Sequence, residues 1–146
     1  MIVTNNNLLL LVLILFTFAI TACSQTTPEE TAVSLPAQNS DGYTDIDVTQ
    51  LTTMLEAKDF TFVNVHVPYA GDIPQTDLSI PFDQIDINLN QLPSDKGSPL
   101  VVYCRSGNMS PQAAKTLADL GYTNEMDVDG GMNAWQAAGY ELVNNP

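Results

Sequence analysis

The hydrophobic positions divide the 146-residue chain into three parts. Residues 8–22 form an uncharged apolar run, shorter than the roughly 20 residues of a membrane-spanning helix and suited to the core of a signal peptide. Residues 24–42 are rich in Thr, Ser, Pro, Glu and Asn and show no hydrophobic period, as expected of a linker. Periodic patterns begin at Tyr43. The pattern therefore predicts a leader over 1–22, a linker over 23–42 and one domain over 43–146.

The domain opens with the patterns of a helix and then a strand. Four apolar residues recur at the spacing of one helix face: Val48, Leu51, Met54 and Leu55. Asp47 and Gln50 match a capping box, so we expect a helix over 48–57. Residues 60–67 then alternate like a strand that ends at Pro68. The predicted strand has Phe62 on one face and Val63, Val65 and Val67 on the other.

The rest of the domain continues to alternate between strands and helices. Prolines interrupt residues 68–99, where we expect at most a short helix near 82–87. The later predicted elements are a strand over 100–103, a helix over 111–120, a strand over 125–128, a turn at Gly130-Gly131 and a helix over 132–138. Residues 100–103 are all apolar, which is typical of a strand buried on both faces of a parallel sheet. The pattern predicts an α/β fold, a small parallel sheet flanked by helices, in which Ser110 caps the second helix.

The end of the apolar run carries a second signal. Ile20-Thr21-Ala22-Cys23 resembles a bacterial lipobox, in which lipid is attached to the cysteine and the chain is cleaved before it. This resemblance implies a lipoprotein anchored through Cys23 on the extracytoplasmic side of a membrane, either periplasmic or at the cell surface. Ser24 would favour the outer membrane if the organism has one. An uncleaved anchor helix is the alternative, and in both cases the membrane is a partner of the protein.

Charge and composition exclude several functions. The chain has 17 acidic and 4 basic residues, a formal net charge of −13, so nucleic-acid binding is not expected. One His and two Cys argue against a structural zinc site, and no metal or other cofactor is expected. The aspartates form no calcium-binding loop, and only Asp127 with Asp129 makes a pair that merits inspection.

Cys104 is the candidate for chemistry because of where it stands. It follows the buried strand and precedes a predicted helix, with residues 105–109 between them. A short loop that closes over a helix N-terminus turns backbone amides inward and forms an anion site. We expect the helix dipole and Arg105 to favour the thiolate of Cys104. The alternative is a buried structural cysteine, and a dithiol mechanism is excluded because Cys104 is the only thiol left after lipidation of Cys23.

The residues around Cys104 resemble a known family. The CRSG loop, the alanine-rich helix after it, the Gly-Tyr-x-Asn step, the GGxxAW turn and the Ala-Gly-Tyr end are similar to the active-site half of a single-domain rhodanese. The match is dense over about 40 residues and looser over the whole of 43–143. In the first half, VNVHVP and GDIP stand where rhodaneses usually have Asp-Val-Arg and Gly-His-Ile-Pro. The resemblance implies a rhodanese-like, three-layer α/β domain.

The resemblance also implies a reaction. Cys104 would take a sulfane sulfur from thiosulfate or a persulfide, hold it as a persulfide, and pass it to cyanide or a thiol. The binding loop would comprise Arg105, Ser106, Gly107, Asn108, Met109 and Ser110, whose amides would cradle the charged sulfur. A non-catalytic rhodanese-like module that binds a partner, or senses sulfide or oxidants through Cys104, is the alternative function. A purely structural lipoprotein would instead require an unreactive Cys104 thiol.

Two comparisons with related loops refine this hypothesis. Phosphatases on a related fold place an arginine six positions after the cysteine, where this chain has Ser110, so phosphatase and arsenate-reductase functions are disfavoured. Active rhodaneses commonly have a basic residue at the position of Met109. With Arg105 as the only arginine and a net charge of −13, the site should attract the thiosulfate dianion poorly. We therefore expect weak thiosulfate turnover and a preference for persulfides or less charged donors.

The remaining candidates are given mainly structural roles. His66 is the only histidine, and we expect it to be a hydrogen-bonded residue at the strand end rather than a general base. Asn64, where the family has aspartate, suggests neutral hydrogen bonds in place of an ion pair. Trp135 and Tyr103 are expected in the core, and the two glycines of the predicted turn are expected to serve that turn.

Overall fold

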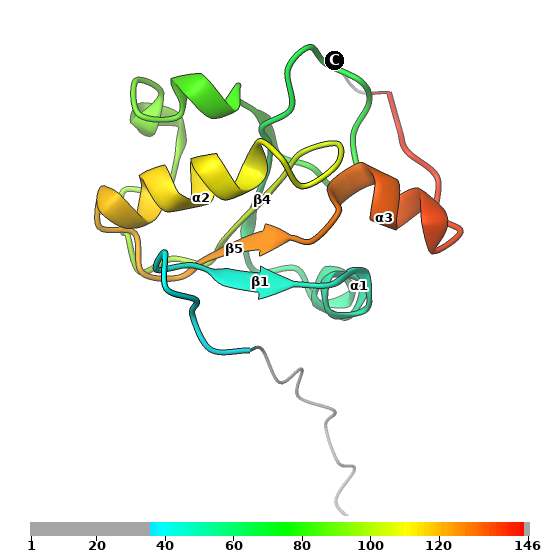
Figure 1. The fold of residues 1–146 in the computed structure, drawn as a ribbon, viewed down its shortest axis with the longest axis horizontal. Coiled ribbons are helices and arrows are strands. Elements are labelled where there is room, and N and C mark those ends of the chain that lie inside the picture. The colour runs from blue at the N-terminus through cyan, green and yellow to red at the C-terminus, as the bar shows by residue number, and fades with distance from the viewer. Residues whose placement is uncertain (1–35, 145–146) are drawn as a thin grey trace, which may run out of the picture. The chain divides into compact units, whose positions relative to one another are not determined.

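The computed structural model describes residues 36–144, which contain a five-stranded parallel sheet of order β1-β5-β4-β2-β3 (Figure 1). The strands are β1 Thr44–Ile46, β2 Thr61–Asn64, β3 Leu78–Ser79, β4 Leu100–Tyr103 and β5 Glu125–Val128. All four strand pairings are parallel, and β4 lies at the centre between β5 and β2. The predicted α/β fold with a small parallel sheet is confirmed.

Helices cover both faces of this sheet. They are α1 Val48–Glu56, α2 Ser110–Asp119 and α3 Gly131–Ala137, together with two short 3-10 helices, η1 Phe82–Gln84 and η2 Leu89–Gln91. Leu117 of α2 packs into one core cluster with Val63 and Val102. Leu51 of α1 and Trp135 of α3 pack into a second cluster, on the other face of the sheet. The molecule therefore has three layers, with α2 on one side of the sheet and α1 and α3 on the other (Figure 1).

The alternation of Phe62, Val63 and Val65 separates the two cores as the sequence predicts, but β2 is shorter than the predicted strand over 60–67 and Val67 is exposed. Phe62 lies in the cluster under α1 and α3, whereas Val63 and Val65 lie in the cluster under α2. Every residue of Leu100–Tyr103 has an exposed fraction of 0%. A strand that contributes apolar side chains to both cores is fixed in register, because a one-residue slip would exchange its two faces. The residue that follows β4, Cys104, is therefore held firmly at the carboxyl end of the central strand.

The N-terminus of α1 is formed as the sequence predicts, whereas that of α2 is not. Asp47 accepts a hydrogen bond of 2.8 Å from the amide of Gln50, and the Gln50 side chain accepts one of 2.9 Å from the amide of Asp47, which confirms the capping box. The prediction that Ser110 caps α2 is wrong. Met109 is the N-cap and makes no side-chain cap bond. The Ser110 hydroxyl donates to the sulfur of Cys104 instead, at 3.3 Å.

Several short elements carry no clear signal in the sequence. β1 has three residues and β3 has two, too few for an alternating pattern to be visible. Both are edge strands, and each is defined by the ladder it forms with its neighbour. The short helix expected near 82–87 is the single 3-10 turn η1.

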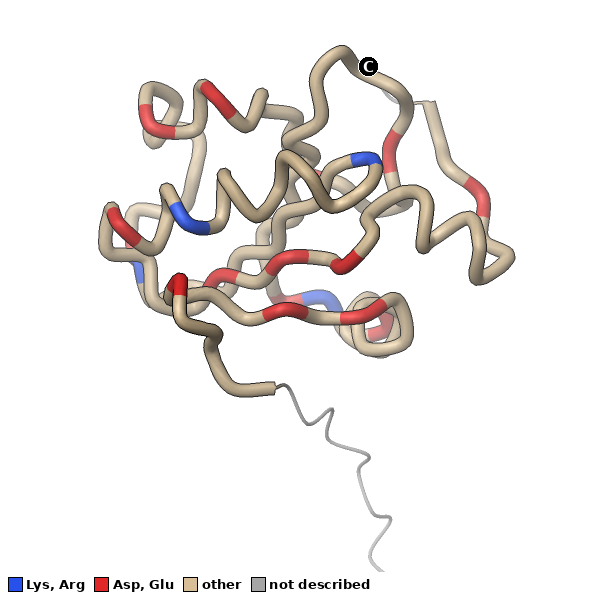
Figure 2. Tube along the Cα trace, viewed as in Figure 1, with Lys and Arg blue, Asp and Glu red and all other residues tan. Residues whose placement is uncertain are grey.

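The predicted leader and the lipidation site Cys23 lie outside the described residues. Within the predicted linker, Gln38 donates a side-chain hydrogen bond of 3.1 Å to the carbonyl of Thr123, and the Asn39 side chain donates one of 2.9 Å to Asp45. Over residues 36–144, no helix is both long enough and apolar enough to cross a membrane. Figure 2 shows acidic positions spread along the trace of the domain, with few and separate basic positions.

Candidate active site

The candidate site lies where the parallel strands end. Cys104 follows the last residue of β4, and residues 105–109 connect it to α2. Ligands of open α/β sheets bind outside the carboxyl ends of the strands, where the loops leave the sheet. The Cys104 side chain belongs to the cluster on the α2 side and is 1% exposed.

Three hydrogen-bond donors converge on the sulfur of Cys104. The amides of Gly107 and Met109 lie 3.1 Å and 3.4 Å from Sγ, and the Ser110 hydroxyl lies 3.3 Å from it. Donors fixed in this way favour a negative charge at the position they surround. The loop therefore forms a preorganised site for an anionic sulfur, built from the residues that the sequence singles out.

These donors determine the charge state of the thiol. Burial is the largest single influence and raises the pKa of Cys104, but the Ser110 hydroxyl and the amides of Ser110, Met109 and Ser106 together outweigh it and lower the pKa below its ordinary value. Hydrogen bonds from the loop and from the start of α2 therefore favour the thiolate.

The first turn of α3 donates hydrogen bonds to the backbone of the loop. The amide of Met132 donates to the carbonyl of Cys104 at 3.0 Å, and the amide of Asn133 donates to the carbonyl of Arg105 at 2.9 Å. Gly131 has φ +51°, and a Cβ on it would stand 1.9 Å from the Cys104 carbonyl oxygen. Gly131 therefore does more than form a turn, because it lets the backbone of α3 approach the reactive loop closely. The sequence shows the glycines but not this contact.

The predicted binding residues differ in their access to solvent. Arg105, Ser106 and Asn108 are exposed, whereas Gly107 and Met109 are half-buried and Ser110 is buried. The Asn108 side chain donates to the Ser106 hydroxyl at 3.2 Å. Met109 packs against the core cluster under α2.

His66 and Asn64 lie at the end of β2. The Asn64 side chain donates to Asp72 at 2.8 Å and to the carbonyl of Gly71 at 3.0 Å, and it accepts a bond of 3.0 Å from the amide of His66. Burial, followed by the charge of Arg105, lowers the pKa of His66. Asn64 thus makes hydrogen bonds in place of an ion pair, but one of them goes to an acidic side chain, that of Asp72, rather than to a neutral group.

Asp127 and Asp129, the pair noted in the sequence, have different environments. Asp127 is 1% exposed, whereas Asp129 is exposed. Burial is the main reason that the pKa of Asp127 rises to about 7. Across residues 36–144, no three His, Cys, Asp or Glu side chains are grouped so that they could hold a metal ion.

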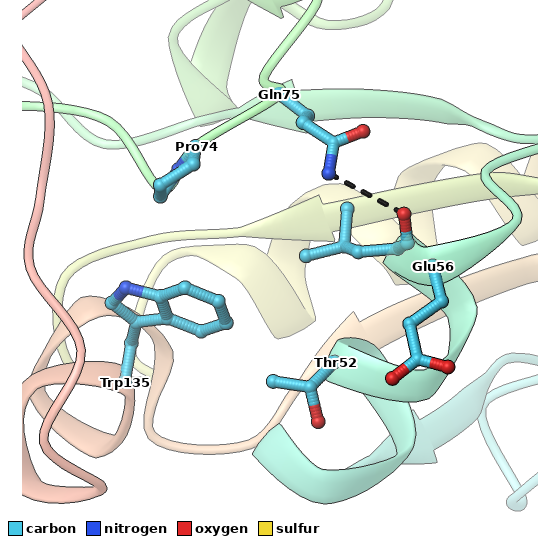
Figure 3. Close-up of a pocket in the computed structure, with 6 residues that line it drawn as sticks. Thr52, Glu56, Pro74, Gln75 and Trp135 are labelled. Carbon is cyan, nitrogen blue, oxygen red and sulfur yellow. Dashed lines mark hydrogen bonds between the residues drawn. The ribbon is translucent and has the colours of Figure 1, made fainter.

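A separate groove of about 270 Å³ lies on the opposite side of the sheet (Figure 3). It is lined by Thr52, Leu55, Glu56, Pro74, Gln75 and Trp135. Trp135 is only 5% exposed, and its indole nitrogen donates to the carbonyl of Glu141 at 3.0 Å, while Tyr103 is fully buried. The prediction that these two aromatic residues belong to the core is confirmed. The groove is formed by α1, by Trp135 of α3 and by the segment that carries Pro74 and Gln75, not by the loop after Cys104.

Comparison with known proteins gives concordant results. Residues 38–138 match the family model of the rhodanese-like domain. The chain is 33% identical over 103 residues to a sulfurtransferase of Allochromatium vinosum, a match that covers 68% of this chain and 94% of that protein. It is 27% identical over 101 residues to the thiosulfate sulfurtransferase GlpE of Pseudoalteromonas translucida, covering 67% of this chain and 93% of the relative. The fold is similar to that of a rhodanese-related protein of Thermoplasma volcanium, with TM-score 0.61, 27% identity, and coverage of 70% of this chain and 100% of the other.

Proposed function

The chain belongs to the rhodanese-like domain family, and on this premise we propose that it is a sulfurtransferase that carries sulfane sulfur on Cys104. The Cys104 thiolate attacks the outer sulfur of the donor. A new sulfur–sulfur bond forms, the old one breaks, and its electron pair leaves with the donor, as sulfite when the donor is thiosulfate. A thiol or cyanide acceptor then attacks the outer sulfur of the persulfide and restores the thiolate.

One observation carries this proposal, namely the three donors around the Cys104 sulfur. Two amides and one hydroxyl within 3.1–3.4 Å of Sγ favour the thiolate that must attack. A loop of this kind also provides amides for the outer sulfur of a persulfide, which carries negative charge. The exposed residues Arg105, Ser106 and Asn108 would meet the donor first. The relatives named sulfurtransferases support the same reaction class.

The charge of the loop bears on the choice of donor. Met109 carries no charge, so Arg105 is the only positively charged side chain of residues 105–110. Because steering of a dianion depends on local positive potential, we expect persulfides and other less charged donors to be used in preference to thiosulfate.

The persulfide can be detected directly. The full chain with Cys23→Ser, in which Cys104 is the only cysteine, is incubated with thiosulfate or polysulfide and its intact mass is measured. We expect one added sulfur, about 32 Da, that a thiol removes and that the further variant Cys104→Ser does not acquire. If no donor produces the adduct although Cys104 reacts with iodoacetamide, the non-catalytic binding or sensing module becomes the better interpretation.

We further propose that the domain is anchored outside the cytoplasmic membrane by lipid on Cys23, because a lipobox-like sequence follows the apolar run. When the full chain is expressed in bacteria fed radiolabelled palmitate, we expect a labelled protein that partitions into detergent. A Cys23→Ala variant should be unlabelled. Equal labelling of the two chains would contradict lipidation at this cysteine.

A further inference from the structure

The groove between α1 and Trp135 has apolar walls and one charged residue (Figure 3). Leu55 of α1, Pro74 and the indole of Trp135 supply apolar surface, and Glu56 is the charged side chain among the lining residues. Tyr140 stacks on Trp135 with 4.5 Å between the ring centroids, which helps to hold the indole in place. A fixed apolar surface beside a carboxylate complements a ligand that has an aliphatic stem and a positively charged end.

Glu56 has no basic partner in the described part of the chain. No basic residue lies in the last turn of α1, and Lys58, two residues beyond Glu56, is paired with Asp77 at 2.6 Å. The other three basic residues of the chain are engaged elsewhere or lie in another loop: Lys96 donates to the carbonyl of Leu120, Lys115 pairs with Asp119, and Arg105 follows Cys104. The exposed carboxylate of Glu56 is therefore available to a cation from outside the domain.

Two features of the groove are unfavourable for the fold itself. Glu56 is the last residue of α1, where the helix dipole is negative and an acid is unfavourable. Gln75 has φ +68°, a conformation that residues other than glycine rarely adopt, and its side chain donates to the carbonyl of Leu55 at 3.4 Å (Figure 3). Local costs of this kind are typical of functional sites. The helix end and the carboxylate together make this part of the groove attractive to a cation.

We propose that the groove receives a lysine or arginine side chain of a partner protein. The aliphatic stem lies against Leu55 and Trp135, and the positive end meets the carboxylate of Glu56. The net charge of −13 favours the approach of a basic partner. This inference concerns a surface away from Cys104 and goes beyond sulfur transfer, on which it does not depend.

The size of the groove favours a side chain over a free small molecule. Its volume of about 270 Å³ lies below the roughly 300–1,000 Å³ of cavities that enclose small ligands. Of its six lining residues, Trp135 alone is buried. A free ligand in so open a site would remain largely in water, whereas a side chain can bind there as one part of a larger contact.

The single tryptophan of the chain reports on this groove. The full chain with Cys23→Ser, isotope-labelled in nitrogen, is titrated with a blocked glycine peptide that carries one central lysine or arginine. The indole N–H signal of Trp135 is followed by NMR, which detects weak binding. A matched peptide carries norleucine, whose stem is similar but uncharged. We expect a saturable shift with the lysine and arginine peptides, and about threefold weaker binding of the norleucine peptide.

Glu56→Gln tests the charge without removing the apolar walls. We expect this variant to bind the lysine peptide about threefold more weakly than the parent does, and to bind the norleucine peptide unchanged. Asp59→Asn is the matched control, because Asp59 is also exposed but does not line the groove, and it should keep the preference for lysine. An unchanged indole signal without peptide shows that each variant is folded. Equal binding of the two peptides to the parent, or equal losses in the two variants, would overturn the proposal.

Two further measurements identify the occupant. Butylamine has a similar stem and charge but no peptide backbone, and we expect it to bind more weakly than the lysine peptide. Equal affinity would make the groove a site for small amines and overturn the assignment to a partner protein. The indole signal of the chain alone should not change with protein concentration, and a change would show that a second copy fills the groove, which also overturns it. None of these outcomes affects sulfur transfer by Cys104, so the two proposals fail separately.

Discussion

At the scale of single residues, Ser110 explains how the site differs from an ordinary helix start. Met109 is the N-cap of α2 and cannot accept a hydrogen bond from the first turn, so the helix lacks a side-chain cap, which is typically worth about 1 kcal/mol. Ser110, the first residue of the helix, donates its hydroxyl to the sulfur of Cys104, which gains a third donor. Such a local sacrifice is expected at a functional site rather than in the rest of a fold.

Met109 is the residue at which the choice of donor can be tested. We expect Met109→Arg to raise kcat/KM for thiosulfate by about tenfold, because a cation beside the loop would attract the dianion. The gain should shrink in high salt, which screens the charge. Met109→Gln is the neutral control and should show no gain. The assay is thiosulfate:cyanide turnover, and equal or higher activity in the parent protein would contradict the account.

At the scale of secondary structure, the site depends on contacts between elements that are distant in sequence. Cys104 follows the carboxyl end of β4, and Ser110 is the first residue of α2. Amides at the start of α3 donate hydrogen bonds to the first carbonyls of the loop. β5 brings Asp127 beneath α2. The loop is thus clamped between α2 and α3, which explains how flexible residue types such as Ser and Gly can hold a fixed arrangement of donors.

The contact between α3 and the loop gives a prediction for Gly131. Gly131→Ala should lower the free energy of unfolding by about 3 kcal/mol or more and slow alkylation of Cys104, because its Cβ would stand 1.9 Å from the Cys104 carbonyl oxygen. Gly139→Ala is the matched control, since Gly139 also has positive φ, +93°, but a Cβ there meets nothing within 4 Å. The control should lose only about 1 kcal/mol and keep its alkylation rate. Urea unfolding separates these outcomes, and equal losses in the two variants would contradict the contact.

The elements also show how far the sequence alone determines the structure. The strong periodic patterns predict α1 and the position of β2, although β2 ends at Asn64 and not at residue 67, and the apolar run of β4 predicts its burial on both faces. The strand Glu125–Val128 is predicted with the observed bounds although it alternates acids with apolar residues. The sequence does not predict β1 and β3, because an alternating pattern cannot be recognised in two or three residues. These strands form only through their pairing with neighbouring strands.

The sequence predicts only the part of the site whose residues are adjacent in the chain. The loop after Cys104 is visible in the sequence because cysteine, small residues and a helix signal follow one another. The direction of the Ser110 hydroxyl is not visible, because a serine before proline reads as a cap. Nor is the approach of Gly131, since it reaches the loop only through the packing of α3.

At the scale of the whole molecule, acidic residues lie in the interior of the domain as well as on its surface. The formal net charge is −13, yet Glu125 and Asp127 are buried in the α2 side of the domain. Burial raises the pKa of both groups, that of Asp127 to about 7. Surface acids keep the domain soluble and away from anionic surfaces, whereas these two make folding sensitive to pH.

The sign of this pH dependence follows from the raised pKa values. An acid that binds its proton more tightly when folded stabilises the protein fully below its unfolded value, 3.8 for Asp127, and this stabilisation is lost as the pH rises through about 7. We therefore expect the free energy of unfolding to fall between about pH 4 and pH 7, by up to about 4 kcal/mol from Asp127 alone. Asp127→Asn should make the free energy of unfolding less dependent on pH, whereas Asp59→Asn, at an exposed position, should not. Urea unfolding at several pH values measures this, and a profile that rises with pH and is unaffected by Asp127→Asn would contradict it.

The central claim is that Cys104 carries sulfur from a donor to an acceptor, and a single-turnover experiment with a labelled donor tests it most directly. The full chain with Cys23→Ser is loaded from polysulfide labelled in its sulfane sulfur, freed of excess donor, and mixed with a thiol acceptor. The account predicts one label per chain before mixing, quantitative transfer of that label to the acceptor, and none in the Cys104→Ser variant. Label that never enters the chain, or that stays on it when the acceptor is added, would contradict the account.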